Sequence, residues 1–169
     1  MTSFPVEHRI RCHGFLVERK TKGRKIVPEK CNEYEIPAAF YDHLKKGEDY
    51  ERKDGLMGKN EWVTEEGPPV KRYAYCADTL FTDSFLPVIR GADTIYHECT
   101  YLEADKAKAE ARYHSTAAQA AQVAQMAGAK QLLLGHFSSK YKELEAFGQE
   151  ACAVFSNSLV SVEGVAYEV

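Results

Sequence analysis

The 169-residue sequence predicts an α/β fold in which polar groups gather along one edge of a sheet. A mostly apolar strand, Lys71 to Asp78, runs into a carboxylate and is followed directly by Thr79. Two later strands also end in polar residues, at His97-Glu98 and at His136, and a helical stretch follows each of the three. Repeated strand-to-helix units bring such strand ends to one rim of a sheet, so we expect these side chains to lie close together.

Composition limits the class of protein. The length fits one domain or part of one, and a hydrophobic content of 44% is enough for a core. The net charge of −3 excludes a basic field over the whole molecule, so RNA contact needs local patches or metal. No apolar run approaches the ~20 residues of a membrane span. The N-terminus has no apolar signal core. Five cysteines without CxxC pairs favour reduced thiols and a cytoplasmic protein.

The first part of the chain is expected to form strands. Residues 8–20 alternate apolar and polar side chains, and Arg24 to Val27 predicts a second short strand. Lys22-Gly23 between them is expected to form a hairpin-like turn. His8 would begin the first strand, where an isolated histidine is ordinarily a surface residue.

Residues 28–70 differ in composition, and we interpret them as an acidic excursion from the core. Within this segment we expect a short helix at Ala38 to Lys46, a turn at Asp54-Gly55 and a brief strand at Trp62-Val63. Gly67-Pro68-Pro69 closes the segment.

The remaining elements follow the central strand in turn. Helices are expected at Leu80 to Arg90, Glu103 to Arg112, residues 116–128 and Lys142 to Ser156, and strands at Asp93 to Glu98, Lys130 to Gly135, Leu159 to Val162 and Val165 to Val169. The strongest helix signal is a capping box of Thr116 and Gln119, with Gly128 at the other end. His114 would precede this helix, where the helix dipole disfavours a protonated imidazole. A carboxylate is needed there to hold the proton, and Glu98 is the candidate.

Two imidazoles and a carboxylate on one rim suit zinc, manganese or iron. Asp78 is able to bridge two cations, because each of its oxygens can bind one. A bridged pair activates a water molecule and holds a phosphodiester in line. The alternative is that Asp78 is a turn residue that caps the next segment.

An ordered set of segments resembles ribonuclease Z, the tRNA 3′-processing endonuclease family of the metallo-β-lactamase fold. The segments, in chain order, are FPVEHRIRCHGF, CADT, HECTY, YHST before an alanine-rich helix, and GHFSSKY. The resemblance spans essentially the whole chain. It implies that residues 1–169 are the C-terminal half of an αβ/βα sandwich, with a mixed sheet and helices on one face.

The resemblance also implies roles for single residues. His8 would bind one metal ion and His136 the other, with Asp78 bridging the two. Glu98 and His114 are similar to the family's proton-transfer couple, in which His114 donates to the leaving 3′-oxygen. The general need for a carboxylate beside His114 agrees with this.

Ser138, Lys140 and Tyr141 resemble the loop around the scissile phosphate. Lys140 stands where the family has arginine, and so gives up a bidentate fork. Residues 28–70 occupy the place of the arm that grips tRNA in a dimeric enzyme, although here the segment is acidic. The implied full-length parent is a cytoplasmic homodimer that acts on precursor tRNA with two divalent metal ions, zinc first, with manganese and iron as alternatives.

The family's His-x-His-x-Asp-His run does not occur in the sequence. That run supplies further metal ligands and the water-activating aspartate, so we expect a missing N-terminal half. The chain alone is therefore expected to be inactive as a nuclease and to hold metal weakly, since zinc prefers four ligands. The alternatives are another phosphodiesterase of this fold, acting on small or cyclic nucleotides, and a non-catalytic module for assembly or dimerisation.

Overall fold

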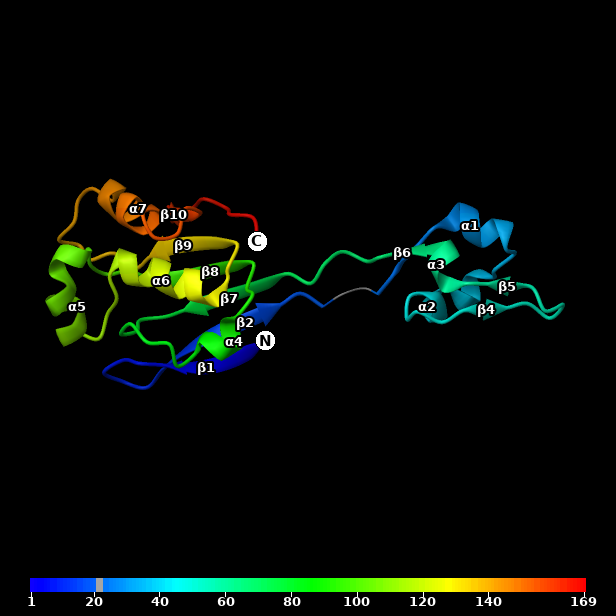
Figure 1. The fold of residues 1–169 in the computed structure, drawn as a ribbon, viewed down its shortest axis with the longest axis horizontal. Helices are drawn as coiled ribbons and strands as arrows, with labels where there is room; N and C mark the ends of the chain where they lie inside the picture. Colours follow the sequence, from blue (N-terminus) through cyan, green and yellow to red (C-terminus); the bar gives the residue numbers. More distant parts are fainter. Residues whose placement is uncertain (21–22) are drawn as a thin grey trace. The chain divides into compact units, whose positions relative to one another are not determined.

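The structure is a computed structural model and describes residues 1–20 and 23–169. It contains two compact units: residues Met1–Glu18 with Lys71–Val169, and residues Arg19–Val70 (Figure 1). The turn expected at Lys22-Gly23 includes Lys22, which lies outside the described residues. No helix within the described ranges is long and apolar enough to cross a bilayer.

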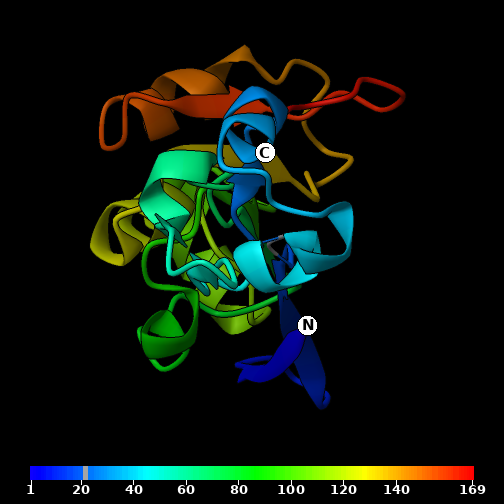
Figure 2. The same ribbon diagram turned by 90° about the vertical axis from the view of Figure 1, so that its right-hand side faces the viewer.

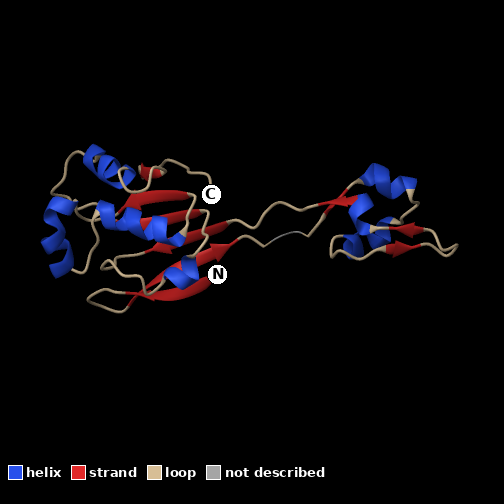
Figure 3. Ribbon diagram, viewed as in Figure 1, coloured by secondary structure: helices blue, strands red, loops and turns tan. Residues whose placement is uncertain are grey.

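The first unit is built on a six-stranded sheet (Figure 3). Its strands are β1 (Thr2–Val6), β2 (Cys12–Glu18), β7 (Arg72–Cys76), β8 (Thr94–Glu98), β9 (Gln131–Gly135) and β10 (Ser158–Val160). Its helical segments are α4 (Leu86–Ile89), η2 (Glu103–Asp105), α5 (Lys106–Ala111), α6 (Ala117–Ala127) and α7 (Glu145–Cys152).

The strand order is β1-β2-β7-β8-β9-β10. The first three strands pair antiparallel, whereas β7, β8, β9 and β10 run parallel to one another. Helix α6 lies over β8 and β9, with α4 beside it (Figure 3), and α7 lies alongside β10 (Figure 2). The predicted α/β class, with a mixed sheet and helices on one face, is confirmed.

Helix α6 is close to the sheet because alanines form its buried face. The buried alanines of the helix are Ala117, Ala120, Ala121, Ala124 and Ala127. The predicted capping box is present: Gln119 N donates to Thr116 Oγ1 over 3.2 Å, and Thr116 N donates to the Gln119 side chain over 3.0 Å. Gly128 ends the helix with φ of 65°, a conformation that glycine adopts without strain.

The opposite face of the sheet carries a row of large apolar side chains. In register, Phe15 lies opposite Tyr75, Tyr75 opposite Tyr96, Tyr96 opposite Leu133, and Leu133 opposite Leu159. The Tyr75 and Tyr96 rings stack with centroids 4.9 Å apart. Phe15 and Tyr75 are 37% and 40% exposed, which is unusual for side chains on inner strands, and Leu159 on the edge strand β10 is 38% exposed. We refer to these five residues as the uncovered sheet face.

The second unit has its own small core of Cys31, Ile36, Leu44 and Val63. Its elements are β3 (Lys25–Ile26), α1 (Pro28–Glu33), η1 (Ala38–Phe40), α2 (Tyr41–Leu44), β4 (Tyr50–Glu51), β5 (Met57–Gly58), α3 (Asn60–Val63) and β6 (Thr64–Glu65). Strand β3 pairs with β6 and with no other described strand, so the hairpin expected between residues 8–20 and 24–27 is wrong. This pairing is also why the unit begins before residue 28.

The strand expected at residues 8–20 is a loop followed by strand β2, and a separate strand, β1, precedes it. Pro5 makes β1 difficult to recognise in the sequence, because proline lacks the N–H that a central strand needs. Strand β1 tolerates it as an edge strand of the sheet. His8 therefore lies in the loop between β1 and β2 rather than at the start of a strand.

Three further expectations are wrong in detail. Trp62-Val63 belongs to helix α3, because the buried Asn60 side chain donates to the Leu44 carbonyl over 2.7 Å and fixes this turn against α2. The helix expected at residues 80–90 is limited to α4, where Pro87 fits the first turn. Residues 165–169 form no strand, since the chain turns at Gly164 with φ of 80°.

Candidate active site

Polar side chains from four separate segments gather at one edge of the six-stranded sheet. Asp78 follows β7 and His136 follows β9, and Asp78 Oδ1 lies 3.4 Å from His136 Nε2. The ring centroid of His114, just before α6, is 5.2 Å from that of His8 and 5.4 Å from that of His136. The carboxyl ends of the parallel strands β7, β8 and β9 meet at this edge, which is why the residues converge.

Two groups of these side chains have the spacing of metal ligands. His8, Asp78 and His114 offer ligand atoms within 4.8 Å of one another, and so do Glu98, His114 and His136. The sequence places His114 outside the ligand set, whereas the geometry places it in both groups. Its Nδ1 is already hydrogen-bonded to Glu98, so only its Nε2 is free for further chemistry.

Glu98 is a buried carboxylate surrounded by donors. Its Oε1 accepts from Thr79 N over 3.1 Å, from Ser115 N over 3.0 Å and from His114 Nδ1 over 2.9 Å. Its Oε2 accepts from the backbone and hydroxyl of Thr100 over 2.8 and 2.9 Å. Burial acts to raise the pKa of Glu98, but the bonds from His114 and Thr100 outweigh it and the pKa lies below its usual value. Glu98 is therefore held as an anion.

The pKa of His114 is shifted in the opposite direction. Its hydrogen bond to Glu98 raises the pKa of the imidazole above its usual value, against the effect of partial burial. The Asp78 carboxylate also acts to raise the pKa of His114. Glu98 therefore favours the protonated form of His114, in which the Nε2–H would be available to a neighbouring acceptor.

His8 and His136 are each tethered through Nδ1. His8 Nδ1 lies 2.9 Å from the Tyr113 carbonyl, and His136 Nδ1 lies 2.9 Å from Thr100 Oγ1. A ring that donates its Nδ1–H in this way presents the lone pair of Nε2. This is the usual arrangement of histidines that bind metals. Together with the Asp78 carboxylate, the donor set fits divalent ions such as zinc, manganese or iron.

The backbone is strained at two points of the site. His136 has φ of 59° and Tyr113 has φ of 60°, in the left-handed region that residues other than glycine seldom adopt. Each costs about 1–3 kcal/mol unless the surroundings compensate. Both residues support the tethers described above, since His136 is one of the tethered rings and Tyr113 supplies the carbonyl for the other.

The loop after β9 carries the residues expected around the phosphate. Ser138 N donates to the Thr100 carbonyl over 3.1 Å, which fixes the loop beside the site. The Lys140 ammonium forms an ion pair with Asp105, and the Tyr141 hydroxyl donates to the same carboxylate over 2.5 Å. Lys140 and Tyr141 are thus on the expected loop, but their polar groups are engaged with Asp105.

Sequence reasoning missed Thr100, Thr79 and the Tyr113 carbonyl. Thr100 stands two residues after Glu98 in the segment HECT, and this spacing is the only signal that could have indicated it. Thr79 was noted as the neighbour of Asp78, but its role is to donate its backbone N–H to Glu98. The Tyr113 carbonyl carries no signal in the sequence, because any residue type supplies one.

The chain is similar to known proteins over nearly its whole length. A ribonuclease Z from Porphyromonas gingivalis strain W83 is 42% identical over 161 residues, which are 95% of this chain and 53% of the relative. A ribonuclease Z from Parabacteroides distasonis is 38% identical over 167 residues, or 99% of this chain and 55% of the relative. The chain thus spans about half the length of the curated relatives it matches. No protein-family model matches the chain.

A solved structure supports the fold. A metallo-beta-lactamase fold protein from Bacillus subtilis superposes with a TM-score of 0.63 at 20% identity, covering 99% of this chain and 48% of that protein. This likeness confirms the predicted fold.

Proposed function

The chain is related to ribonuclease Z over 95% of its length, and we propose that it forms part of an endoribonuclease that cleaves precursor tRNA at the 3′ side. One observation carries the proposal. A buried Glu98–His114 pair, 2.9 Å between Oε1 and Nδ1, lies beside two histidines that present Nε2 around Asp78. A proton donor next to a site for divalent ions is what phosphodiester hydrolysis requires.

We propose that His8 and His136 bind two divalent ions, zinc or alternatively manganese or iron, with Asp78 between them. When bound, such ions supply an activated water and neutralise charge on the phosphodiester. The chain's own contribution is orientation. Tyr113 and Thr100 fix the two rings, and the 3.4 Å approach of Asp78 Oδ1 to His136 Nε2 defines where a shared ligand would be.

His114 is proposed to give its Nε2 proton to the leaving 3′-oxygen. Glu98 holds the imidazole by Nδ1, keeps it protonated and is itself fixed by Thr79, Thr100 and Ser115. Because Glu98 is buried and anionic, its charge stabilises the imidazolium before the proton leaves. Replacing His114 removes the donor, whereas replacing Glu98 leaves the donor with a lowered pKa.

The chain alone is proposed to be inactive. His8 with Asp78, and His136 with Asp78, give each ion fewer than the four ligands that zinc prefers. The part of the relatives that this chain does not match is proposed to supply the remaining ligands. It is also proposed to cover the uncovered sheet face, whose exposed Phe15 and Tyr75 are suited to an apolar partner surface.

Other properties of the parent protein are proposed on the same basis. The resemblance to ribonuclease Z supports a homodimer, and all five cysteines are free thiols, which supports the cytoplasm. Residues 28–70 are proposed to occupy the place of the tRNA-gripping arm.

A second candidate function is hydrolysis of small or cyclic nucleotides. It is favoured by the second unit, where carboxylates engage much of the positive charge. Lys30 pairs with Glu33 over 2.9 Å, Lys45 pairs with Asp42 over 3.0 Å, and Arg52 pairs with Glu35 and Asp54. Such a surface attracts RNA poorly.

A complementation assay separates the two functions. The chain is combined with the unmatched part of the Porphyromonas gingivalis relative, and zinc or manganese is added. Cleavage of precursor tRNA, with little hydrolysis of cyclic nucleotides, is the expected result. The reverse preference would support the second candidate. Activity on neither substrate, with both parts folded and associated, would favour an assembly module.

A further inference from the structure

Three cations surround the buried ring of Tyr101, the residue after Thr100. The Lys108 and Lys140 ammonium groups lie 5.6 and 5.9 Å from the ring centroid, and Arg112 Nη1 donates to the Tyr101 hydroxyl over 3.4 Å. Such distances are typical of cation–π contacts. Lys108 and Arg112 have no role in the ligand set or the proton-transfer pair. We refer to Tyr101, Lys108, Arg112 and Lys140 as the Tyr101 cluster.

The cluster adjoins the candidate active site. The Tyr101 ring meets the His114 ring edge-on, with centroids 6.3 Å apart. Arg112, which donates to the Tyr101 hydroxyl, stands two residues before His114 in the chain, so its charge lies beside the site. Tyr101 is only 2% exposed and is therefore a fixed platform. An RNA strand whose phosphodiester is at His114 would pass beside these cations.

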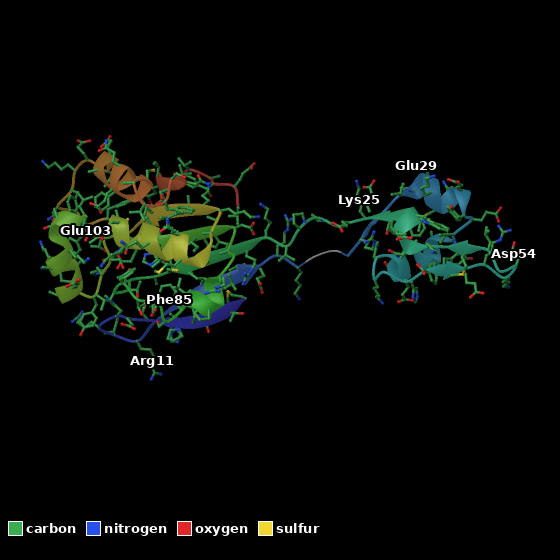
Figure 4. The ribbon with its side chains drawn as sticks, in the orientation of Figure 1. Arg11, Lys25, Glu29, Asp54, Phe85 and Glu103 are labelled. Carbon is green, nitrogen blue, oxygen red and sulfur yellow. The ribbon has the colours of Figure 1, made fainter. Side chains whose placement is uncertain are left out.

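One carboxylate, Asp105, interacts with the two lysines of the cluster. Asp105 pairs with Lys140 and accepts from the Tyr141 hydroxyl, and the pKa of Asp105 is lowered first by Lys140, next by Tyr141, and also by the charge of Lys108. The neighbouring Glu103, labelled in Figure 4, is engaged with Lys106 over 3.1 Å and with the Thr116 hydroxyl over 2.6 Å. The cluster therefore keeps an excess of positive charge on a chain whose net charge is −3.

We propose that Lys108, Arg112 and Lys140, arranged around Tyr101, bind a phosphodiester of the RNA strand next to the bond that is cleaved, and that Asp105 occupies Lys140 until RNA arrives. This rests on the proposed function, because it takes RNA as the substrate. Each nucleotide of RNA carries one negative charge, so phosphates that flank the reacting one need cations of their own. Lysine provides such a cation, because its ammonium group is a point charge on a flexible side chain.

Binding without catalysis tests the cluster. The 169-residue chain is titrated into a fluorescently labelled single-stranded RNA of five nucleotides, in the presence of a chelator, and anisotropy is recorded at several salt concentrations. We expect the double variant K108A/R112A to weaken binding at least tenfold. Its salt dependence should fall by about 0.7 in the log–log slope for each contact removed. We expect D105N to tighten binding several-fold, because Lys140 is released.

Matched controls separate the cluster from general charge. K106A removes a cation of the same helix that pairs with Glu103, and D83N removes an exposed carboxylate elsewhere; both should leave binding within twofold of the wild-type value. Circular dichroism confirms that each variant is folded. Equal affinity of K108A/R112A and K106A would overturn the proposal, and so would weaker binding by D105N.

Inorganic phosphate forms the second arm of the experiment. If it binds with the same dependence on Lys108 and Arg112 while the RNA does not bind, the cluster is a site for free phosphate and the proposal is wrong. Metal and cleavage play no part in these measurements. A failure of precursor-tRNA cleavage would therefore be distinguishable from a failure of RNA binding.

Discussion

The hydroxyl oxygen of Thr100 lies 2.9 Å from Nδ1 of His136. The same hydroxyl donates its single proton to Glu98 Oε2 over 2.9 Å, so toward His136 it can only accept. His136 must then carry its proton on Nδ1 and present Nε2 to Asp78. One buried hydroxyl thus connects the proton-transfer pair with a predicted metal ligand, and it does so before any ion binds.

Replacing Thr100 by valine tests this connection. The change keeps the shape of the side chain but removes one of the donors to Glu98 Oε2 and leaves the Nδ1–H of His136 without its acceptor. We expect the free energy of unfolding to fall by about 1–3 kcal/mol, the usual effect of leaving buried polar groups without partners. Urea denaturation measures it. The control is T82V, at a partly exposed threonine that donates to Glu7 over 3.0 Å, where we expect a change under about 0.5 kcal/mol. Equal effects of the two variants would contradict the assignment.

Replacing Glu98 by glutamine should lower the pKa of His114. The hydrogen bond that His114 donates to Glu98 is the main cause of the raised pKa, and glutamine retains the shape without the charge. An NMR titration of the His114 ring, in the presence of a chelator, measures the change directly. An unchanged His114 pKa in E98Q would show that the carboxylate does not hold the proton.

The same pair predicts a window of pH dependence. The folded-state pKa of His114 is raised above 6.5, so its contribution to stability is complete below pH 6.5 and is lost as pH rises through the raised value. The folded-state pKa of Glu98 is lowered from 4.5, so its contribution is complete above pH 4.5 and is lost as pH falls through the lowered value. The stability difference between wild type and E98Q should therefore be largest between pH 4.5 and 6.5. A stability difference between wild type and E98Q that does not change with pH would contradict this prediction.

Zinc binding tests the incomplete ligand set. We expect the wild-type chain to bind zinc weakly and D78N to bind it still more weakly, because Asp78 belongs to the ligand sets of both proposed ions. Competition with a chromogenic chelator gives the affinities, and D83N is the control for loss of one exposed carboxylate. One tightly held equivalent of zinc in the chain alone would show that its ligands are sufficient.

We expect a partner protein to cover the uncovered sheet face. Tyr75 is on an inner strand yet 40% exposed, so Y75K should lower the unfolding midpoint only modestly, through loss of the stack on Tyr96. It should, however, weaken association with the unmatched part of a ribonuclease Z relative. Analytical ultracentrifugation measures the association. M126K, which alters a 44% exposed methionine on α6, is the matched control and should associate as the wild type does.

The parts of the fold that could be predicted are those with strong local patterns. Strands β7, β8 and β9 are apolar runs that end in polar residues, and α6 has a capping box and a terminal glycine. Strand β1 could not be predicted, because Pro5 excludes a central strand and only its edge position permits it. The short strands β3 and β6 are a similar case, since each is defined by a partner about forty residues away along the chain.

For the candidate site, two signals indicated the residues: polar side chains at the ends of successive strands, and the resemblance to a family. The residues are His8, Asp78, Glu98, His114 and His136. The contacts that hold them were not predictable, because the Tyr113 carbonyl and the Thr100 hydroxyl are ordinary groups until the sheet places them. The engagement of Lys140 by Asp105 is likewise a long-range contact, without a local pattern.

The most direct test of the central claim is the site of cleavage in a precursor tRNA labelled at its 5′ end. The wild-type chain alone should leave the RNA intact. The chain combined with the unmatched part of the Porphyromonas gingivalis relative should cut once, at the 3′ side of the tRNA, and H114A in the same mixture should not cut. Cleavage by the chain alone, or equal cleavage by wild type and H114A, would contradict the account.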